Sequence, residues 1–241
     1  MPHETGHLSD GPEGDSAGAL DAAARHLRAS PRPARTSPAR DREILRGRQT
    51  RDLLAWARES GCLIEPSFYL ARIEDAGEEH RVWLDEVSQR YFKATHAGRF
   101  GFFIIALADG TAELTGATPL EYLERLQLQN QLFTDDIQLI GVALEREQVV
   151  IVTSQEAIRG EEVSAAEMLV FMAKLWFHPL HGLTLGRPGA LAFYRDLDEA
   201  AAFDAHPGNF VKDDNGVVLP IDLILVRADE LLQKALQVHL N

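Results

Sequence analysis

Apolar side chains recur along the chain at two spacings, one typical of amphipathic helices and the other of strands. Segments with an apolar residue every three or four positions predict helices at residues 50–61, 118–130, 164–177 and 228–240, with a further candidate at 197–203. Shorter apolar or alternating segments predict strands at residues 80–86, 89–95, 100–107, 136–144 and 148–154. This order predicts an α+β fold in two lobes, in which a strand-rich N-terminal half precedes a helical half that contains one β-hairpin.

Residues that favour helix ends support three of these helices. Thr118 is a suitable N-cap and is followed by Pro119, which is well placed at the first helical position. Ser164 caps the third predicted helix in the same way. For the first helix we expect Thr50 as the N-cap and Gly61 as the residue just past the end, because glycine adopts the left-handed conformation without strain.

The first 48 residues have a different composition. They are rich in Gly, Pro, Ser, Ala and Arg, and the run SPRPARTSPAR has neither periodicity nor a large apolar side chain. Such a segment buries too little apolar surface to offset the entropy of ordering it. We therefore expect residues 1–48 to form a disordered tail, in which residues 18–27 make at most a transient helical turn or two.

One hairpin carries an unusual set of polar residues, in the run FDAHPGNFVKDDNGVVLPID at residues 203–222. Asn215-Gly216 between two β-prone segments predicts a two-residue type I′ turn. With that turn, Asn209 lies directly opposite Asp222, and their Cβ atoms are about 4.5–5.5 Å apart. An amide oxygen and a carboxylate at this distance can share a hard cation such as Mg²⁺. The alternatives are a surface hairpin with incidental polar residues, or a longer loop with a bulge over residues 212–214.

Composition limits the class of protein. The chain has 241 residues, of which 45% are hydrophobic and 25% charged, and these values are typical of globular proteins. It has no apolar run near the roughly 18 residues of a membrane-spanning helix, and its first residues lack the pattern of a secretory signal. A single cysteine, Cys62, excludes a disulfide framework and a cysteine-based zinc site. We expect a cytoplasmic protein without a membrane partner.

The charge of the chain is unevenly distributed. The formal net charge is −13 at pH 7, yet residues 1–50 contain eight arginines against seven acidic residues. Residues 51–241 therefore carry a net charge of −14. Such a surface repels polyanions, so we expect no nucleic-acid partner. A nucleotide held in a pocket is still compatible with this charge, because a bound metal ion reverses the local field.

The polar hairpin residues also form a motif. In D-A-H-P-G-N, Asn209 lies five residues after Asp204, which is the spacing of Asp and Asn in the kinase catalytic loop, and Asp222 follows across the hairpin. This resembles the catalytic core of the protein-kinase-like phosphotransferases, nearest to the D-x-H-x-x-N form of aminoglycoside-type kinases. With EEHRVW and YFKAT upstream, the chain is similar, over about residues 50–241, to the polyvalent-protein kinase-like domains of bacterial mobile elements.

The resemblance implies a bilobal kinase-like fold and a role for each matching hairpin residue. The N-lobe is expected at residues 49–152, with its strands, and a small helical C-lobe at residues 159–241. Asp204 corresponds to the catalytic aspartate, which orients the attacking hydroxyl or accepts its proton. Asn209 and Asp222 correspond to the residues that hold Mg²⁺ against the phosphates of ATP.

The resemblance also implies nucleotide-binding residues in the N-lobe. Lys93 in YFKAT matches the lysine that binds the α- and β-phosphates. Glu124, or alternatively Glu121, is expected to orient Lys93, and we favour Glu124 because it lies beside the leucine stripe of its helix. The hinge is expected at residues 153–158, and the nucleotide-binding residues assigned to it are Thr153, Ser154, Gln155 and Ala157.

The chain departs from the kinase pattern at several positions. No G-x-G-x-x-G precedes Lys93, and only Gly77 lies in the corresponding turn, where Glu79 and His80 are alternative phosphate contacts. Leu223 and its neighbour replace Phe-Gly after the metal-binding aspartate. Nineteen residues follow Asp222, which is short for an activation segment and a full helical lobe, so small-molecule acceptors stay open beside proteins.

Taken as a whole, the sequence predicts an ATP- and Mg²⁺-dependent phosphotransferase, a kinase that moves the γ-phosphate to a hydroxyl of an unidentified protein or small molecule. One alternative is a pseudokinase, a binding or regulatory module without turnover. Another is a metal-dependent hydrolase that uses Asp204 and Asp222 as ligands. The expected partners are a nucleotide and the unknown phosphoacceptor.

Overall fold

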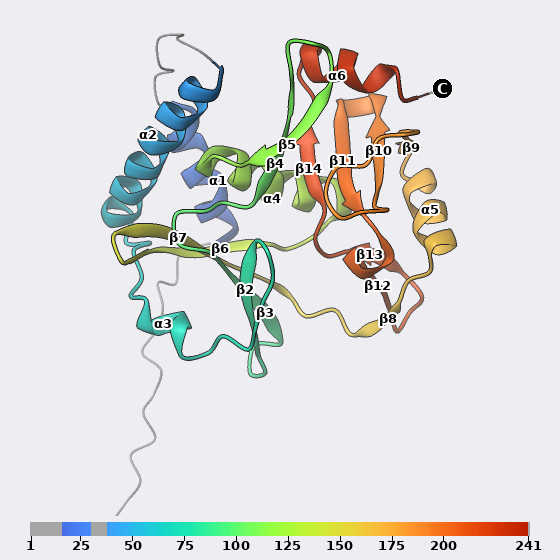
Figure 1. The fold of residues 1–241 in the computed structure, drawn as a ribbon. Helices are drawn as coiled ribbons and strands as arrows, with labels where there is room; N and C mark the ends of the chain where they lie inside the picture. The colour runs from blue at the N-terminus through green and yellow to red at the C-terminus, as the bar shows by residue number, and fades with distance from the viewer. Residues whose placement is uncertain (1–15, 30–37, 241) are drawn as a thin grey trace, which may run out of the picture.

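The computed structural model describes residues 16–29 and 38–240 as a mixture of α-helices and antiparallel sheets (Figure 1). This mixture confirms the predicted α+β class. Within these residues the α-helices are α1 (Ser16–Arg28), α2 (Pro38–Glu59), α3 (Ser67–Leu70), α4 (Pro119–Phe133), α5 (Ala165–Lys174) and α6 (Glu230–Gln237). The predicted caps of α4 and α5 are confirmed, because Thr118 and Ser164 each accept a hydrogen bond from the backbone N–H three residues later, within a capping box.

The N-terminal sheet has the strand order β1-β2-β3-β7-β6, and each neighbouring pair is antiparallel. Its strands are β1 (Asp75–Ala76), β2 (His80–Asp85), β3 (Arg90–Thr95), β6 (Gln138–Glu145) and β7 (Gln148–Glu156). The four longer strands overlap the predicted ones. Lys93 lies on the central strand β3, opposite Val82 on one side and Thr153 on the other. Its backbone is therefore fixed from both directions.

The C-terminal half contains more strands than predicted. One sheet has the order β14-β11-β10-β9, formed by β9 (His178–Pro179), β10 (Leu191–Arg195), β11 (Ala200–Ala205) and β14 (Ile224–Arg227). Another has the order β13-β12-β8, formed by β8 (Gly160–Glu162), β12 (Phe210–Asp213) and β13 (Val218–Pro220). In the described residues of this half, α5 and α6 are the only α-helices, so the C-terminal half is not the mainly helical unit that the sequence suggested.

The helix predicted at residues 197–203 is wrong. The short 3₁₀ helix η1 (Asp196–Asp198) and strand β11 occupy this segment. Strand β11 pairs with β10 on one side and with β14 on the other, and its alanines are fully buried. Alanine has the highest intrinsic helix propensity, but burial in the middle of a sheet outweighs a preference of less than about 1 kcal/mol per residue.

A hairpin and a helix connect the two halves. The hairpin of β4 (Phe102–Ala106) and β5 (Ala112–Gly116) extends toward α6 (Figure 1), and Ile104 packs with Phe203 and Leu236 of the C-terminal half. Helix α4 contributes Tyr122, Leu123 and Leu126 to the core against the N-terminal sheet, and Leu128, Leu132 and Phe133 to the core of the C-terminal half. Because both halves pack on α4, this helix can bring side chains to the region between them.

The expectation of a disordered tail over residues 1–48 is wrong where the structure describes it. Helix α1 packs against α2, α4 and β6, and its buried side chains recur at helical spacing: Leu20, Ala23, Ala24 and Leu27. The two alanines let the helix approach its neighbours closely, so a short apolar stripe suffices to bury it. Residues 1–15 and 30–37 lie outside the described residues.

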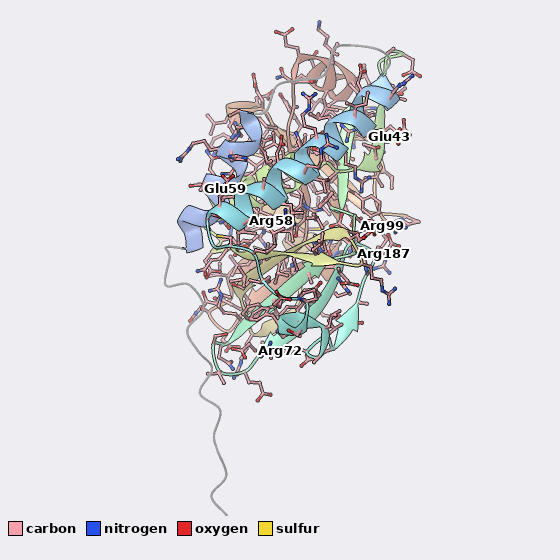
Figure 2. All side chains as sticks on the ribbon, turned by 90° about the vertical axis from the view of Figure 1, so that its left-hand side faces the viewer. Glu43, Arg58, Glu59, Arg72, Arg99 and Arg187 are labelled. Atoms are coloured by element: carbon pink, nitrogen blue, oxygen red, sulfur yellow. The ribbon has the colours of Figure 1, made fainter. Side chains whose placement is uncertain are left out.

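Helix α2 is longer than predicted and lies across one face of the molecule, where Glu43, Arg58 and Glu59 are exposed (Figure 2). It begins at Pro38, so Thr50 is not its N-cap; the Thr50 hydroxyl donates instead to the Arg46 carbonyl within the helix. Among residues 16–29 and 38–240, no helix combines the length and apolar character that a membrane crossing requires.

Candidate active site

A cleft of about 580 Å³ brings together residues that are far apart in the sequence. Lys93 of β3, Asp204 at the end of β11 and Asp222 after β13 all line it. The turn between β1 and β2 forms one wall, and the loop around Arg187 forms another. Three of the residues that the kinase resemblance singled out therefore line the same space.

Asp204 is held in an unusual backbone conformation by a glycine-containing loop. Its φ angle is +57°, in the left-handed region, and its Oδ1 accepts a hydrogen bond of 2.6 Å from the backbone N–H of Arg187. Gly186 has φ +107°, and a Cβ at this position would come within 2.7 Å of the Asp204 Cγ. The loop thus approaches the carboxylate as closely as it does because residue 186 is glycine.

Asn209 is bound to Asp204. It ends the short 3₁₀ helix η2 (Pro207–Asn209), and its Nδ2 donates to the Asp204 carbonyl over 2.9 Å and lies 3.5 Å from Asp204 Oδ2. The amide nitrogen makes both contacts, so the amide oxygen is the end that can act as an acceptor or a metal ligand. The Asp-Asn spacing of the motif therefore produces a direct contact.

The predicted register of the β12–β13 hairpin is wrong by one residue. Phe210 pairs with Pro220, and the N–H of Ile221 donates to the Asn209 carbonyl, so Asn209 is opposite Ile221 and not Asp222. The turn has three residues, 214–216, of which Gly216 takes φ +80°.

The Asp213 side chain explains this turn. Its Oδ1 accepts hydrogen bonds from the backbone N–H of Asn215 (3.0 Å) and of Val217 (2.7 Å). These bonds favour a longer loop over the two-residue type I′ turn. The loop is longer than a two-residue turn, as the alternative expected, but it lies at residues 214–216 and not at 212–214, because Lys212 and Asp213 belong to β12.

Lys93 and Asp222 lie close together. Lys93 Nζ donates a hydrogen bond of 3.0 Å to the carbonyl oxygen of Ile221. Burial raises the pKa of the Asp222 carboxyl, but the charges of Lys93 and Arg125 outweigh it, and the pKa is lowered to about 2. Asp222 is therefore ionised at neutral pH and faces cations on two sides.

Arg125 is a central residue of the site that the sequence analysis missed. Its side chain is only 5% exposed. Its Nη1 donates to both carboxylate oxygens of Glu79 (2.9 and 2.7 Å), its Nη2 to Asp222 Oδ1 (2.9 Å) and its Nε to the Leu223 carbonyl (2.8 Å). A pattern could have found it, because Arg125 shares one stripe of α4 with the buried residues Tyr122 and Gln129.

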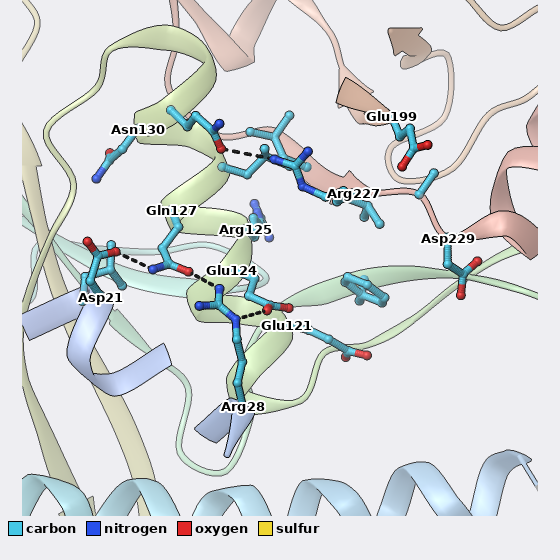
Figure 3. Close-up of a pocket in the computed structure, with 17 residues that line it drawn as sticks. Asp21, Arg28, Glu121, Glu124, Arg125, Gln127, Asn130, Glu199, Arg227 and Asp229 are labelled. Carbon is cyan, nitrogen blue, oxygen red and sulfur yellow. Dashed lines mark hydrogen bonds and ion pairs between the residues drawn. The ribbon is translucent and has the colours of Figure 1, made fainter. Parts of the chain in front are cut away.

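Glu124 does not pair with Lys93. It lies on another side of α4, beside a cavity of about 870 Å³, where its Oε1 accepts a hydrogen bond of 2.7 Å from Arg28 Nε (Figure 3). The alternative candidate, Glu121, forms the capping box of α4 and an ion pair with Arg42. No carboxylate of α4 therefore reaches the lysine, and the helix directs Arg125 into the site instead.

The turn before β2 contributes charged groups where kinases have a glycine-rich loop. Glu79 Oε1 accepts from the Phe102 N–H (2.8 Å), while burial raises the pKa of Glu79 against the opposing charge of Arg125. His80 is buried, and its Nε2 lies 3.0 Å from the Tyr122 hydroxyl. Burial lowers the pKa of His80 to about 3, so its imidazole is neutral at physiological pH.

These two residues also raise the question of a metal site. In the described part of the chain, Glu79, His80 and Asp222 each offer a ligand atom within 4.8 Å of the others. Arg125 already donates to both carboxylates. Both carboxylates are engaged by the guanidinium of Arg125, and His80 Nε2 contacts the Tyr122 hydroxyl, so we do not assign a metal to this trio.

The expected hinge residues lie mostly within a strand. Thr153, Ser154 and Gln155 belong to β7, are buried, and pair with β3. The N–H of Ala157 donates to the Gln89 carbonyl (2.9 Å). Adenine binding by these four residues stays a prediction, and the engagement of their backbone groups within the sheet counts against it.

Comparison with known proteins gives one result. No curated protein and no solved structure matches the chain. Residues 46–226, which include the cleft and every residue that the kinase resemblance singled out, match the family described as Serine/Threonine/Tyrosine Kinase found in polyvalent proteins. The chain belongs to this kinase family of polyvalent proteins.

Proposed function

We propose that the protein is an ATP- and Mg²⁺-dependent phosphotransferase that moves the γ-phosphate to a hydroxyl of a protein or a small molecule. The observation that carries the proposal is that Lys93, Asp204 and Asp222 line a single cleft. Phosphoryl transfer requires positioned cations and an oriented hydroxyl more than covalent chemistry by the protein. These three residues supply both kinds of group.

The donor set is compatible with Mg²⁺. A hard cation takes oxygen ligands, and proteins usually provide one or two carboxylates beside the substrate phosphates. Asp222 offers an ionised carboxylate that lines the cleft. The amide oxygen of Asn209 is not used in its contacts with Asp204, and we propose it as a second ligand although Asn209 is opposite Ile221 in the hairpin and not opposite Asp222. Bound Mg²⁺ would neutralise the phosphate charge that this acidic cleft otherwise repels.

Other residues of the cleft bind the phosphates and orient the acceptor hydroxyl. Lys93 provides a cation for the phosphates. Arg187 donates its N–H to Oδ1 of Asp204, and Oδ2, which lies 3.5 Å from Asn209 Nδ2, has a further lone pair that can orient the acceptor hydroxyl. In the transfer, the hydroxyl oxygen forms a bond to the γ-phosphorus, the bond from that phosphorus to the β,γ-bridging oxygen breaks, ADP leaves, and the hydroxyl proton passes to Asp204.

The proposed function also implies a division of the chain into two lobes and a cellular location. We infer an N-lobe at residues 49–152, a hinge at 153–158, which comprises the last residues of β7 and the first residues after it, and a C-lobe at 159–241. We further infer a cytoplasmic protein that binds a nucleotide and a phosphoacceptor, without a nucleic-acid or membrane partner.

A binding module without turnover is a second candidate. It is favoured by the lack of a carboxylate from α4 beside Lys93 and by the ion pair between Asp222 and Arg125, which engages one carboxylate oxygen. Such a pseudokinase would bind nucleotide and transfer no phosphate.

The test combines binding and transfer. ATP with Mg²⁺ is expected to raise the melting temperature, since a ligand at 100 times its dissociation constant adds about 2.7 kcal/mol to the free energy of unfolding. Mass spectrometry after incubation with ATP and a cell lysate should then detect new phosphate on the protein itself, another protein or a metabolite. Asp204→Ala should keep nucleotide binding and lose transfer, whereas Asp214→Ala, on the exposed hairpin turn, should keep both. Binding without transfer in the wild-type protein would favour the pseudokinase, and no response to ATP would exclude both.

A further inference from the structure

Two cations hold three consecutive residues of the site from opposite sides. Lys93, from β3, donates to the carbonyl of Ile221. Arg125, from α4, donates to the carboxylate of Asp222 and to the carbonyl of Leu223. The segment that carries the proposed metal ligand is therefore connected both to the N-terminal sheet and to the helix between the two halves.

Burying the charged side chain of Arg125 costs free energy unless its hydrogen-bond partners are present. Burial of an arginine disfavours its charged form, but Glu79 and Asp222 raise the pKa of Arg125 above its ordinary value. The guanidinium makes four hydrogen bonds to three partners, so most of its donors are satisfied in the protein interior. A lysine has the same charge but cannot span these partners with one planar fork.

The contact also determines which part of Asp222 is available. Nη2 of Arg125 binds Oδ1, so Oδ2 is the oxygen left for a cation. The bond from Nε to the Leu223 carbonyl fixes the backbone on the far side of the same residue. The orientation of the carboxylate is thus set by a group that does not itself need to contact nucleotide or metal.

We propose that Arg125 is the positioning residue for metal binding in this site: it orients Asp222 from α4, in the place where the kinase pattern led us to expect a glutamate that orients Lys93. This inference rests on the proposed function, because it needs Asp222 to be a metal ligand. Groups that orient a metal ligand in this way change metal affinity by about ten- to a hundredfold when they are removed.

The test measures metal binding directly and does not depend on activity. Arg125→Lys and Arg125→Met are compared with the wild-type protein, and Arg28→Lys and Arg28→Met serve as matched controls, because Arg28 contacts α4 at Glu124 and Gln127, away from the cleft. Binding of Mn²⁺ is followed by electron paramagnetic resonance in the presence of a non-hydrolysable ATP analogue. Affinity for the analogue without metal and the melting temperature are measured for each variant.

We expect both Arg125 variants to bind Mn²⁺ about ten- to a hundredfold more weakly than the wild-type protein. Their affinity for the metal-free analogue should change little, and both Arg28 variants should bind Mn²⁺ as the wild type does. If Arg125→Met is too unstable to purify, Arg125→Lys carries the test, because it keeps a cation between the two carboxylates.

The outcomes separate the two proposals. Mn²⁺ binding that is as tight in the Arg125 variants as in the wild type overturns the positioning role and leaves the phosphotransferase proposal intact. If the wild-type protein binds no Mn²⁺ together with the analogue, the proposed function fails, and the role of Arg125 fails with it.

Discussion

The ammonium of Lys93 lies 3.0 Å from the carbonyl oxygen of Ile221, the residue directly before Asp222. This contact links the central strand of the N-terminal sheet to the hairpin that ends in the proposed metal ligand. Lys93 also lowers the pKa of Asp222, although burial of that carboxyl acts in the opposite direction. The lysine therefore holds the backbone next to Asp222 and, together with Arg125, favours the ionised form of its carboxyl.

Replacement of Lys93 is expected to abolish most phosphate transfer. Lys93→Met removes the cation proposed to bind the phosphates, and the loss of one preorganised electrostatic group typically lowers kcat by roughly 10²–10³-fold. Lys174→Met, at the exposed end of α5, is the matched control and should retain activity. Transfer of labelled γ-phosphate to the acceptor found in the lysate measures the effect, and equal rates for the two variants would contradict the role of Lys93.

Local sequence signals predicted those features that depend on neighbouring residues. The caps Thr118 and Ser164 form as expected because the side-chain oxygen of an N-cap residue lies within reach of the N–H groups in the first turn of its own helix. The longer strands of the N-terminal sheet follow from apolar patterns. The Asp204-Asn209 spacing produced a direct contact, since both residues lie in one short loop.

The errors concern features that depend on tertiary packing. Helix α4 buries two stripes, one against each half of the molecule, so the choice of Glu124 from the leucine stripe alone missed Arg125, which is rotated by about 100°. The hairpin register depended on competition between the Asp213 side chain and the Asn-Gly turn. Helix α1 packs through small residues such as Ala23 and Ala24. The amino-acid composition of the segment does not show that these alanines are buried.

The close approach of Gly186 to Asp204 gives a prediction about the catalytic loop. Gly186→Ala introduces strain at φ +107° and a clash with the carboxylate, so we expect loss of both stability and phosphate transfer. Gly182→Ala is the matched control: its φ is +71°, but a Cβ there has nothing within 4 Å. The control should lose about 1–2 kcal/mol of stability from the left-handed conformation and keep its activity. Denaturant unfolding and transfer assays check this, and normal transfer by Gly186→Ala would argue against the role of Asp204.

Helix α1 is expected to stabilise the folded protein although it precedes the residues that match the kinase family. Leu27→Ala removes a side chain that is 1% exposed and packs in the N-terminal core. The expected cost is about 2–5 kcal/mol of unfolding free energy, because the truncation loses buried apolar contacts and leaves a cavity. Arg25→Ala, an exposed neighbour on the same helix, should change stability little. Guanidinium unfolding measures the stability of both variants. Equal stabilities would mean that α1 does not pack against the rest of the protein in solution.

The buried imidazole of His80 predicts a pH dependence of stability. Burial lowers its pKa from 6.5 to about 3, so in the unfolded chain it takes up a proton below pH 6.5 while the folded protein does not. The unfolded state then binds more protons, and the free energy of unfolding should fall by up to about 1.4 kcal/mol for each pH unit between pH 6 and pH 4. Asp222 changes the stability only below its ordinary pKa of 3.8, whereas Glu79, whose pKa is raised, makes the protein more stable as the pH falls.

The double variant His80→Leu/Tyr122→Phe removes the buried polar pair and retains Glu79, so the difference in slope between it and the wild type isolates the contribution of His80. Guanidinium unfolding at half-unit steps from pH 7 to pH 4 measures both slopes, and parallel curves would show that His80 is protonated in the folded protein.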